Sequence, residues 1–260
     1  MILSSHNPKL KLVRALAGRP KERREAGAFL AEGVRLVEDA LDAGWPFMFV
    51  LYSSDTSKRG QQLVERLVEA GVDVEEVVPG ILRSIAETET SQGVLAILKL
   101  PELTCNTDSK VDFILIPDQI RDPGNLGTLI RSAAAAGAGA IYIPPETTDP
   151  FSPKVVRAGM GGHFRLPICS LGWDEIRDRL QGMTVFLAGA SGATSCWQAD
   201  FHGPLALVVG GEAEGASEQA KRLTNIFVNI PMPGKIESLN AGVAGSVLLF
   251  EVVRQRSEAK

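Results

Sequence analysis

The sequence predicts an α/β protein whose C-terminal part holds a mostly parallel sheet with helices on both faces. Three observations predict this class. Short, nearly continuous apolar runs recur, and each ends at glycine, proline or a polar turn. Segments with apolar residues at helical spacing alternate with these runs. A chain of 260 residues that is 45% hydrophobic and 22% charged is long enough for one or two domains with a sizeable core.

The first 100 residues form the first expected α/β block. Asn7 and Pro8 predict a helix start, because asparagine caps helices and proline suits the first helical position. Further helices are expected at 34–41 and 63–70, with strands at 47–52, 72–78 and 92–98. Residues 101–110 are polar and lack periodicity, so we expect a linker there.

The second block, residues 111–260, contains the expected parallel sheet. A helix is expected at 126–136, and the chain closes with a helix over Ser238–Arg256 whose apolar residues recur at three- and four-residue steps. Strands with so few polar residues are typical of sheets covered on both faces. The apolar runs lie at 112–117, 140–143, 184–188, 205–209 and 226–230.

Positive charge gathers at the N-terminal end. Between Met1 and Arg35 there are eight Lys or Arg residues and three Glu residues, although the whole chain has a formal net charge of −4. A basic end on an acidic body predicts an anionic partner, with nucleic acid first, and a solvated helix face is the alternative. The candidate RNA-binding residues are Arg19, Lys21, Arg23 and Arg24.

Several classes of protein and site are not expected. No run of about 18 apolar residues predicts a membrane span. The first six residues lack the basic region and apolar run of a signal peptide, so we expect a cytoplasmic protein. Cys105, Cys169 and Cys196 are far apart, and the three histidines have no ligand spacing, so no metal site is expected.

Three loops at the ends of expected strands are candidates for a binding site. They span 118–131, 210–215 and 230–240, and the first and third lead into helices. Ligands of parallel sheets bind beyond the carboxyl ends of the strands, where glycines permit close approach and helix starts present free N–H groups. The phosphate-binding loop, the dinucleotide fingerprint and the zinc-protease helix motif are all missing.

Taken together, the three loops resemble a known set of motifs. Asn125-x-Gly127-x-x-x-Arg131, then Gly210-x-Glu212-x-x-Gly215, then Ile230-Pro-Met with Ser238-Leu-Asn240 resemble the motifs of the SpoU (TrmH-like) RNA ribose methyltransferases, of the SPOUT class. The segment 152–167 resembles the stretch between the first two motifs, so the likeness covers about residues 110–256. The N-terminal part resembles the small RNA-binding domain of many members, on Asn7-Pro8, Arg23-Arg24 and Phe29–Gly33.

The resemblance implies a fold, a reaction and partners. It implies a C-terminal domain with a trefoil knot, transfer of a methyl group from S-adenosylmethionine to a ribose 2′-hydroxyl of structured RNA, and a homodimer. The N-terminal domain favours ribosomal over transfer RNA. By the same resemblance the catalytic candidates are Asn125, Arg131, Glu212, Ser238 and Asn240, and the cofactor-binding candidates are Gly210, Ile230, Met232 and Leu239.

The family often assigns the base to the position of Arg131. The pKa of a guanidinium group lies above about 12, which favours an electrostatic clamp over a base. Both roles stay open at this point, as does the subunit whose cofactor Arg131 serves.

The last helix also suggests a dimer. Its first turns carry Ala241, Gly242, Ala244 and Gly245, small residues that would let another backbone approach. Its later turns carry more apolar side chains than one buried face needs, which indicates a partner surface or a deeply buried helix.

Two other functions remain as alternatives. One is a non-catalytic RNA-binding protein of the same fold, which cofactor binding would separate from an enzyme. The other is a nucleotide-dependent oxidoreductase, which the missing dinucleotide fingerprint disfavours and a test of NADH binding would decide.

Overall fold

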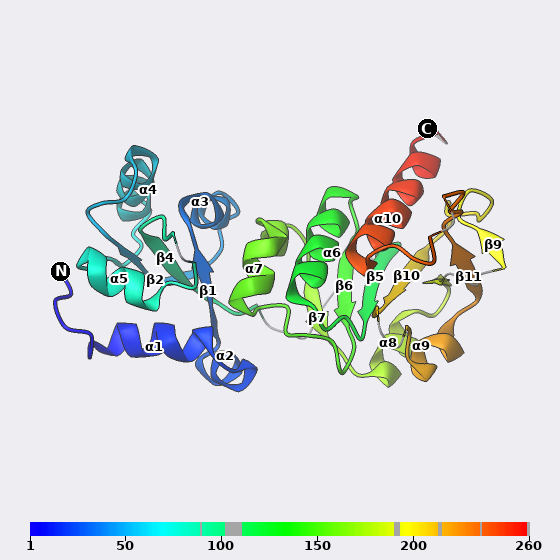
Figure 1. Cartoon of the computed structure of the whole chain (residues 1–260), viewed down its shortest axis with the longest axis horizontal. Helices are drawn as coiled ribbons and strands as arrows, with labels where there is room; N and C mark the ends of the chain where they lie inside the picture. The colour runs from blue at the N-terminus through cyan, green and yellow to red at the C-terminus, as the bar shows by residue number, and fades with distance from the viewer. Residues whose placement is uncertain (89, 102–110, 190–192, 213–214, 235, 259–260) are drawn as a thin grey trace. The chain divides into compact units, whose positions relative to one another are not determined.

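The structure is a computed structural model that describes residues 1–88, 90–101, 111–189, 193–212, 215–234 and 236–258 (Figure 1). The chain forms two compact units. The N-terminal unit comprises Met1–Pro101 and Phe151–Phe164, and the C-terminal unit comprises Glu102–Pro150 and Arg165–Lys260. Each unit combines helices with a sheet, so the predicted α/β class is confirmed.

The N-terminal unit is built on a four-stranded sheet in the order β1-β4-β2-β3. Strand β4 runs antiparallel to both β1 and β2, and β3 runs parallel to β2. The carboxyl ends of β1, β2 and β3 therefore meet at one edge of this sheet. The strands are β1 (Ala28–Glu32), β2 (Phe47–Tyr52), β3 (Val74–Glu76) and β4 (Val94–Lys99).

Helices cover both faces of this sheet. Leu10, Leu16 and Leu82 from α1 and α5 share one core with the sheet, whereas α3 and α4 pack together on the other face (Figure 1). As predicted, Asn7 caps α1, its side-chain oxygen accepting a hydrogen bond from the N–H of Lys9 at 2.8 Å. The helices are α1 (Pro8–Ala17), α2 (Pro20–Ala26), α3 (Val34–Asp42), α4 (Lys58–Glu69), α5 (Pro79–Ile85) and α7 (Pro153–Gly159), which lies against β1.

The sheet of the C-terminal unit has seven strands in the order β7-β6-β5-β10-β8-β11-β9, and all its pairs are parallel. This confirms the predicted parallel sheet. Strands β7 and β9 were not predicted, because three and two residues are too short to show a periodic pattern. The strands are β5 (Phe113–Asp118), β6 (Ala140–Ile143), β7 (Ile168–Ser170), β8 (Thr184–Ala188), β9 (Thr194–Ser195), β10 (Leu205–Gly210) and β11 (Ile226–Asn229).

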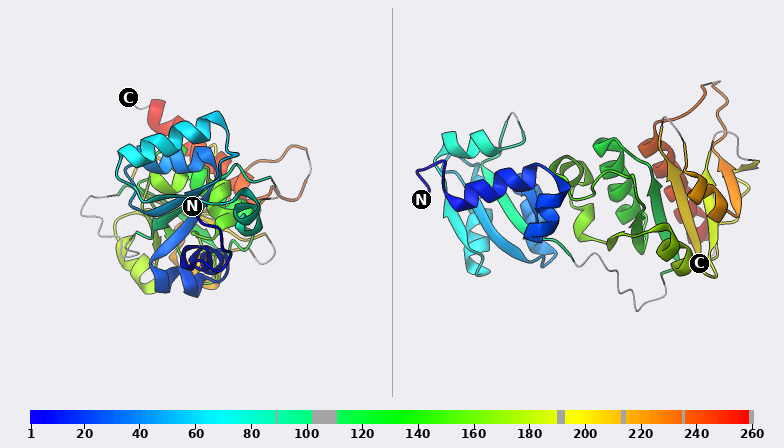
Figure 2. Two further views of the ribbon diagram at one scale, coloured as in Figure 1. Left: turned by 90° about the vertical axis from the view of Figure 1, so that its left-hand side faces the viewer. Right: turned by 90° about the horizontal axis from the view of Figure 1, so that it is seen from below.

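Helices lie on both faces of the parallel sheet, as expected. Ile176 of α8 and Ala220 of α9 share a core with alternate strand residues on one face. On the opposite face α10 packs along α6, and Figures 1 and 2 show α10 in red across the sheet from α9 in orange. The helices are α6 (Pro123–Ala135), α8 (Trp173–Arg179), α9 (Glu218–Leu223) and α10 (Ala241–Glu258). The trefoil knot stays a prediction of the family resemblance.

The glycines of α10 serve contacts within the chain. A Cβ atom on Gly245 would lie 2.3 Å from Cδ2 of Leu129 in α6 and 3.1 Å from Cγ2 of Val209 in β10. A Cβ atom on Gly242 would lie 3.2 Å from Cβ of Thr128. The expectation that these two residues admit a partner's backbone was therefore wrong, since they let α10 approach α6 and the sheet.

We expect Gly245→Val to lower the free energy of unfolding by about 1–3 kcal/mol, because the added methyl groups overpack a buried contact. Urea unfolding followed by circular dichroism measures the change. Gly80→Ala is the matched control, since a Cβ atom there meets nothing within 4 Å and alanine favours the helix. Equal stability of the Gly245 variant and the wild type would contradict the close packing of α10.

In the part of the chain that the structure describes, no helix is long and apolar enough to cross a membrane. The described residues also contain no group of three or more His, Cys, Asp or Glu side chains placed to hold a metal ion.

Candidate functional site

The adjacency of β5 and β10 brings the first two predicted loops together. Gly210 at the end of β10 lies beside Asp118 at the end of β5. The segment that follows β5 leads into α6 and carries Asn125, and the loop after β10 carries Glu212. The third loop reaches the same place through Asn240, which directly precedes α10.

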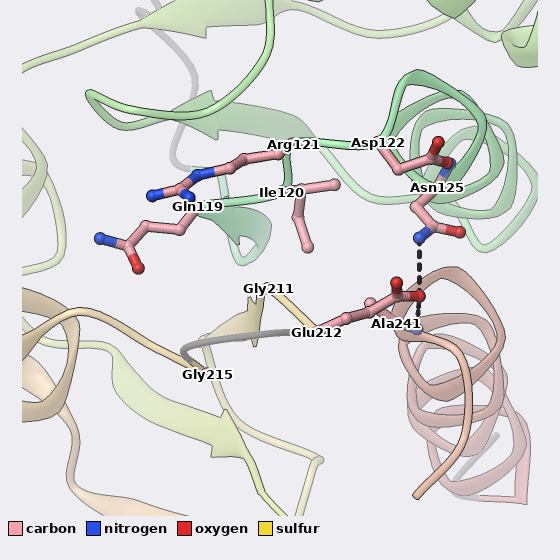
Figure 3. A pocket seen from close by; sticks show the side chains of 9 residues that line it. All are labelled: Gln119, Ile120, Arg121, Asp122, Asn125, Gly211, Glu212, Gly215 and Ala241. Carbon is pink, nitrogen blue, oxygen red and sulfur yellow. Dashed lines mark hydrogen bonds between the residues drawn. The ribbon is translucent and has the colours of Figure 1, made fainter.

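Three of the predicted catalytic residues form one hydrogen-bonded cluster. Oε1 of Glu212 accepts hydrogen bonds from Nδ2 of Asn125 and from Nδ2 of Asn240, both at 2.8 Å. The same oxygen accepts the N–H of Ala241 at 3.3 Å. Figure 3 shows the Glu212 carboxylate between Asn125 and Ala241. One carboxylate oxygen thus joins all three loops.

Helix caps hold both asparagines of this cluster. Asp122 caps α6 by accepting the N–H of Asn125 at 2.8 Å. Asn240 precedes α10, and its Oδ1 accepts the N–H of Val243 at 3.2 Å. Because each residue lies at the first turn of a rigid helix, its side-chain amide is directed at Glu212 with little freedom.

Two cavities open beside the cluster and share Gly211, Glu212, Gly215 and Ala241. The first has a volume of about 200 Å³ and is lined mainly by the segment after β5 (Figure 3). The second has a volume of about 270 Å³ and a mostly apolar wall. Its lining includes all four predicted cofactor-binding residues, Gly210, Ile230, Met232 and Leu239, and two catalytic candidates, Glu212 and Ser238.

The glycines after β10 are required by close backbone contacts. A Cβ atom on Gly210 would lie 2.6 Å from the backbone nitrogen of Ala216, and one on Gly211 would lie 2.4 Å from the carbonyl oxygen of Gln119. A side chain at either position would push the loops apart and change the shared wall of the two cavities.

Sequence reasoning missed several residues of this region. Gln119, Ile120 and Arg121 line the first cavity, and Leu248 of α10 lines the second. Gln119 adopts a left-handed backbone conformation with φ 55°, which is uncommon for a residue other than glycine. Gln119, Ile120 and Arg121 lie in the candidate loop 118–131, directly after an expected strand, which gave them no individual role, and no sequence signal pointed to Leu248.

Asp118 is a fully buried carboxyl at the base of the first loop. Its Oδ2 accepts the N–H of Ser217 at 2.6 Å, and its Oδ1 has no hydrogen-bond partner among the described residues. Burial raises the pKa of this carboxyl, although the bond from Ser217 opposes the rise. Asp118 therefore links the end of β5 to the loop after β10, although burial of its carboxylate away from water is unfavourable.

We expect Asp118→Asn to remove a dependence of stability on pH. Because the pKa is raised on folding, the folded chain binds more protons, and wild-type stability falls as pH rises from the ordinary pKa of 3.8 toward the raised value. The asparagine oxygen can still accept the N–H of Ser217. Urea unfolding at about pH 4 and pH 8 measures the difference, which should favour the variant more at the higher pH. A difference that is the same at both pH values would contradict this account.

Arg131 lies apart from the cluster. It is exposed on α6, lines neither cavity, and has no hydrogen bond or ion pair among the described residues. Six residues after Asn125, it is about 9 Å further along the helix and on a different side of it. Within one chain the structure thus brings together Asn125, Glu212 and Asn240, with Ser238 on the cavity wall, but not Arg131.

The predicted RNA-binding residues differ in their exposure. Arg19, Lys21 and Arg24 are exposed, and Lys21 lies 3.6 Å from Glu25 in an exposed ion pair. Arg23 is only 2% exposed, and its Nη1 donates hydrogen bonds to the carbonyl oxygens of Leu16 and Gly18. Arg23 therefore joins α1 to α2 and is too buried to contact a phosphate. The prediction that Arg23 binds RNA was wrong.

Comparisons with known proteins match both parts of the chain. Residues 112–250 match the SpoU rRNA Methylase family, and residues 7–96 match a domain described as the MRM3-like substrate binding domain. The chain is 32% identical to the 23S rRNA (uridine(2479)-2′-O)-methyltransferase of Streptomyces viridochromogenes, over 98% of this chain and 92% of that protein. It is 31% identical to the 23S rRNA (guanosine(2553)-2′-O)-methyltransferase RlmP of Bacillus subtilis, over 96% and 98%.

Solved structures give the same result. The SpoU methyltransferase AviRb of Streptomyces viridochromogenes, crystallised with the cofactor AdoMet (S-adenosylmethionine), superposes with a TM-score of 0.86 at 31% identity, covering 97% of this chain and 99% of that one. An AdoMet-bound rRNA methyltransferase from Sinorhizobium meliloti superposes with a TM-score of 0.84 at 33% identity, covering 97% of each chain.

Proposed function

Because the chain belongs to the SpoU rRNA methylase family, we propose that it transfers a methyl group from S-adenosylmethionine to a ribose 2′-hydroxyl of ribosomal RNA. The observation that carries the proposal is the cluster of Asn125, Glu212 and Asn240 beside a cavity lined by the four predicted cofactor-binding residues. The full-length relatives named as 23S rRNA 2′-O-methyltransferases support ribosomal RNA as the substrate. We place the activity in the cytoplasm, because the relatives that match along nearly their whole length are bacterial rRNA methyltransferases.

The second cavity fits S-adenosylmethionine. Ile230, Met232 and Leu239 supply an apolar wall, and Gly210 lines the cavity where the backbone of the loop after β10 packs closely. A narrow, mostly apolar site with a few polar groups is what a ligand with an adenine ring and a methionine chain requires. When bound, the cofactor supplies a methyl group on a positively charged sulfur.

Glu212 acts as a positioning residue in this proposal. Its Oε1 accepts three N–H donors from the first and third loops, so we assign Glu212 to holding the three loops in place. Asn125 and Asn240 complete the same linkage. Ser238 is exposed on the wall of the cofactor cavity, and we assign its hydroxyl to a contact with the bound ribose or cofactor.

Arg131 is the residue that meets the RNA in this proposal. Its exposed guanidinium has no counter-ion among the described residues, which leaves it available to a phosphate or to the developing alkoxide. Because it lies away from the cavities of its own chain, we propose that it serves the site of a second copy.

The surface of α10 supports a twofold dimer. Val243 is 47% exposed and Phe250 is 49% exposed, and a spacing of seven residues places them on one stripe of the helix. We propose that this stripe packs against the same stripe of a partner chain.

Phe250→Glu should therefore give a monomer that has lost methyl transfer, because a buried unpaired carboxylate opposes association. Light scattering should report a mass near twice 27.8 kDa for the wild type and near 27.8 kDa for the variant. Phe227→Glu is the control, since Phe227 is 43% exposed on β11, away from α10. A monomeric wild type with full turnover would overturn the dimer.

The proposed activity is tested with purified ribosomal RNA and S-adenosylmethionine carrying a labelled methyl group. Transfer of label to the RNA, with saturable binding of the cofactor and none of NADH, is the expected result. RNA binding without cofactor binding would favour the non-catalytic alternative.

A further inference from the structure

The N-terminal unit carries a large polar cavity outside the proposed active site. The cavity has a volume of about 760 Å³ and lies at the edge where β1, β2 and β3 all end. Val34 and Arg35 line it from the start of α3, Ser53 from the end of β2, and Gln92 from the approach to β4. Beyond the carboxyl ends of parallel strands is where α/β sheets bind ligands.

Arginines dominate the charge of this cavity. Arg59 forms hydrogen bonds with Glu38, and Arg83 lies 3.6 Å from Asp55, so these two have carboxylate neighbours. Arg35 is exposed and has no hydrogen bond or ion pair in the described part of the chain.

A smaller cavity of about 130 Å³ adjoins the first and shares Arg35 and Gln92 with it. Arg157 of α7 lines it, and Nη1 of Arg157 is buried with no hydrogen-bond partner among the described residues. Glu32 also lines this cavity, but its carboxylate accepts hydrogen bonds from the N–H of Glu87 at 2.8 Å and from the hydroxyl of Thr88.

An unpartnered guanidinium nitrogen in a buried position is costly unless a ligand completes it. Nη1 of Arg157 is such a group, and the exposed Arg35, which also lacks a counter-ion among the described residues, lines the same smaller cavity. Gln92 lines both cavities. Its Oε1 accepts the N–H of Val34 at 2.8 Å and so holds the start of α3 in place. The hollow is thus a shaped site with cationic groups that lack anions.

We propose that these two cavities, here named the arginine pocket and lined by Arg35, Arg59, Arg83 and Arg157, bind the phosphodiester backbone of an unpaired RNA strand. The proposal rests on the proposed function, because it gives the RNA substrate a second point of attachment. The planar guanidinium fork matches the oxygens of a phosphate. A recess admits a single strand or a turned-out nucleotide, whereas the phosphates of a regular duplex lie on a convex surface.

The arginine pocket is separate from the basic cluster of Arg19, Lys21 and Arg24. That cluster lies on and before α2, which ends at Ala26, directly before the amino end of β1. The pocket lies beyond the carboxyl end of the same strand, and five residues of strand span about 16 Å. The two basic surfaces can therefore be altered independently.

The test compares variants of the full chain for binding to purified, end-labelled large-subunit ribosomal RNA between about 50 and 200 mM KCl. Arg35→Gln with Arg83→Gln alters the pocket at two exposed positions. Lys11→Gln with Arg222→Gln is the matched control, since it removes the same charge from exposed positions outside the pocket. A third variant, Arg19→Gln with Arg24→Gln, alters the basic cluster. Cofactor affinity is measured for each.

The pocket variant should bind RNA about tenfold more weakly or worse, and its log–log salt slope should fall by roughly 0.7–0.9 for each phosphate that the variant no longer neutralises. Its affinity for S-adenosylmethionine and that of the control should equal the wild-type value. Unchanged RNA affinity and slope in the pocket variant, while the wild type binds and methylates the RNA, would overturn the arginine pocket and leave the proposed function standing. A wild type that binds neither RNA nor cofactor would overturn both.

Discussion

Glu212→Ala should lower kcat/KM for methyl transfer by about 10²–10³-fold, because it removes the single acceptor that ties three loops together. Nδ2 of Asn125 and the N–H of Ala241 would lose their acceptor, and the loop after β10 would lose its tie to the starts of α6 and α10, which Asn240 and Asn125 still link directly at 2.8 Å. A displacement of about 1 Å at a reacting centre is enough for a loss of this size.

The conservative variant tests whether Glu212 acts through position. The amide oxygen of Glu212→Gln can accept the same hydrogen bonds without the charge, so its activity should lie between those of the wild type and the alanine variant. Glu237→Ala, at an exposed position in the third loop, is the control and should behave as the wild type. If the glutamine variant is as inactive as the alanine variant while both bind cofactor normally, Glu212 takes part in the chemistry directly.

Arg131→Ala should reduce turnover by about 10²–10³-fold while leaving the affinity for S-adenosylmethionine within about threefold. Arg131 lines neither cavity of its own chain, so the cofactor does not depend on it. Calorimetry and a turnover assay measure the two quantities. Arg222→Ala, which removes an exposed arginine from α9, is the control. Retained turnover would remove Arg131 from catalysis.

Mixing two inactive variants separates action within a chain from action across a dimer. In a mixed dimer of Arg131→Ala and Glu212→Ala, one site would combine an intact loop cluster with the partner's intact arginine if Arg131 acts across the interface. Random mixing should then restore roughly a quarter of wild-type activity. No restored activity would place Arg131 in the site of its own chain.

The parallel sheet and its helices were predictable because apolar runs and helical spacing are local signals. The cluster of Asn125, Glu212 and Asn240 was not predictable from such signals. Glu212 is 87 residues from Asn125, and Asn240 is 115 residues from Asn125. Only the pairing of β5 with β10 and the packing of α10 on α6 bring them together. The family resemblance identified these three residues as candidates, and only the structure revealed the hydrogen bonds between them.

The charge pattern of the sequence gave one wrong prediction, at Arg23, and gave no indication of the arginine pocket. The run from Arg19 to Arg24 drew attention because its charges are adjacent, yet Arg23 is buried against two backbone carbonyls. The arginine pocket gave no such signal, since its arginines are scattered over four helices. Gly242 and Gly245 show the same limit, because small residues look alike whether they face a partner or the chain's own α6.

The most direct test of the central claim is the position of the transferred methyl group. Purified protein is incubated with large-subunit ribosomal RNA and labelled S-adenosylmethionine, and the RNA is digested to nucleosides and analysed by mass spectrometry. We expect the label on the ribose 2′-oxygen of one nucleotide, with about 10²–10³-fold slower labelling by Arg131→Ala. Label on a base, or no label on RNA from a protein that binds the cofactor, would contradict the account.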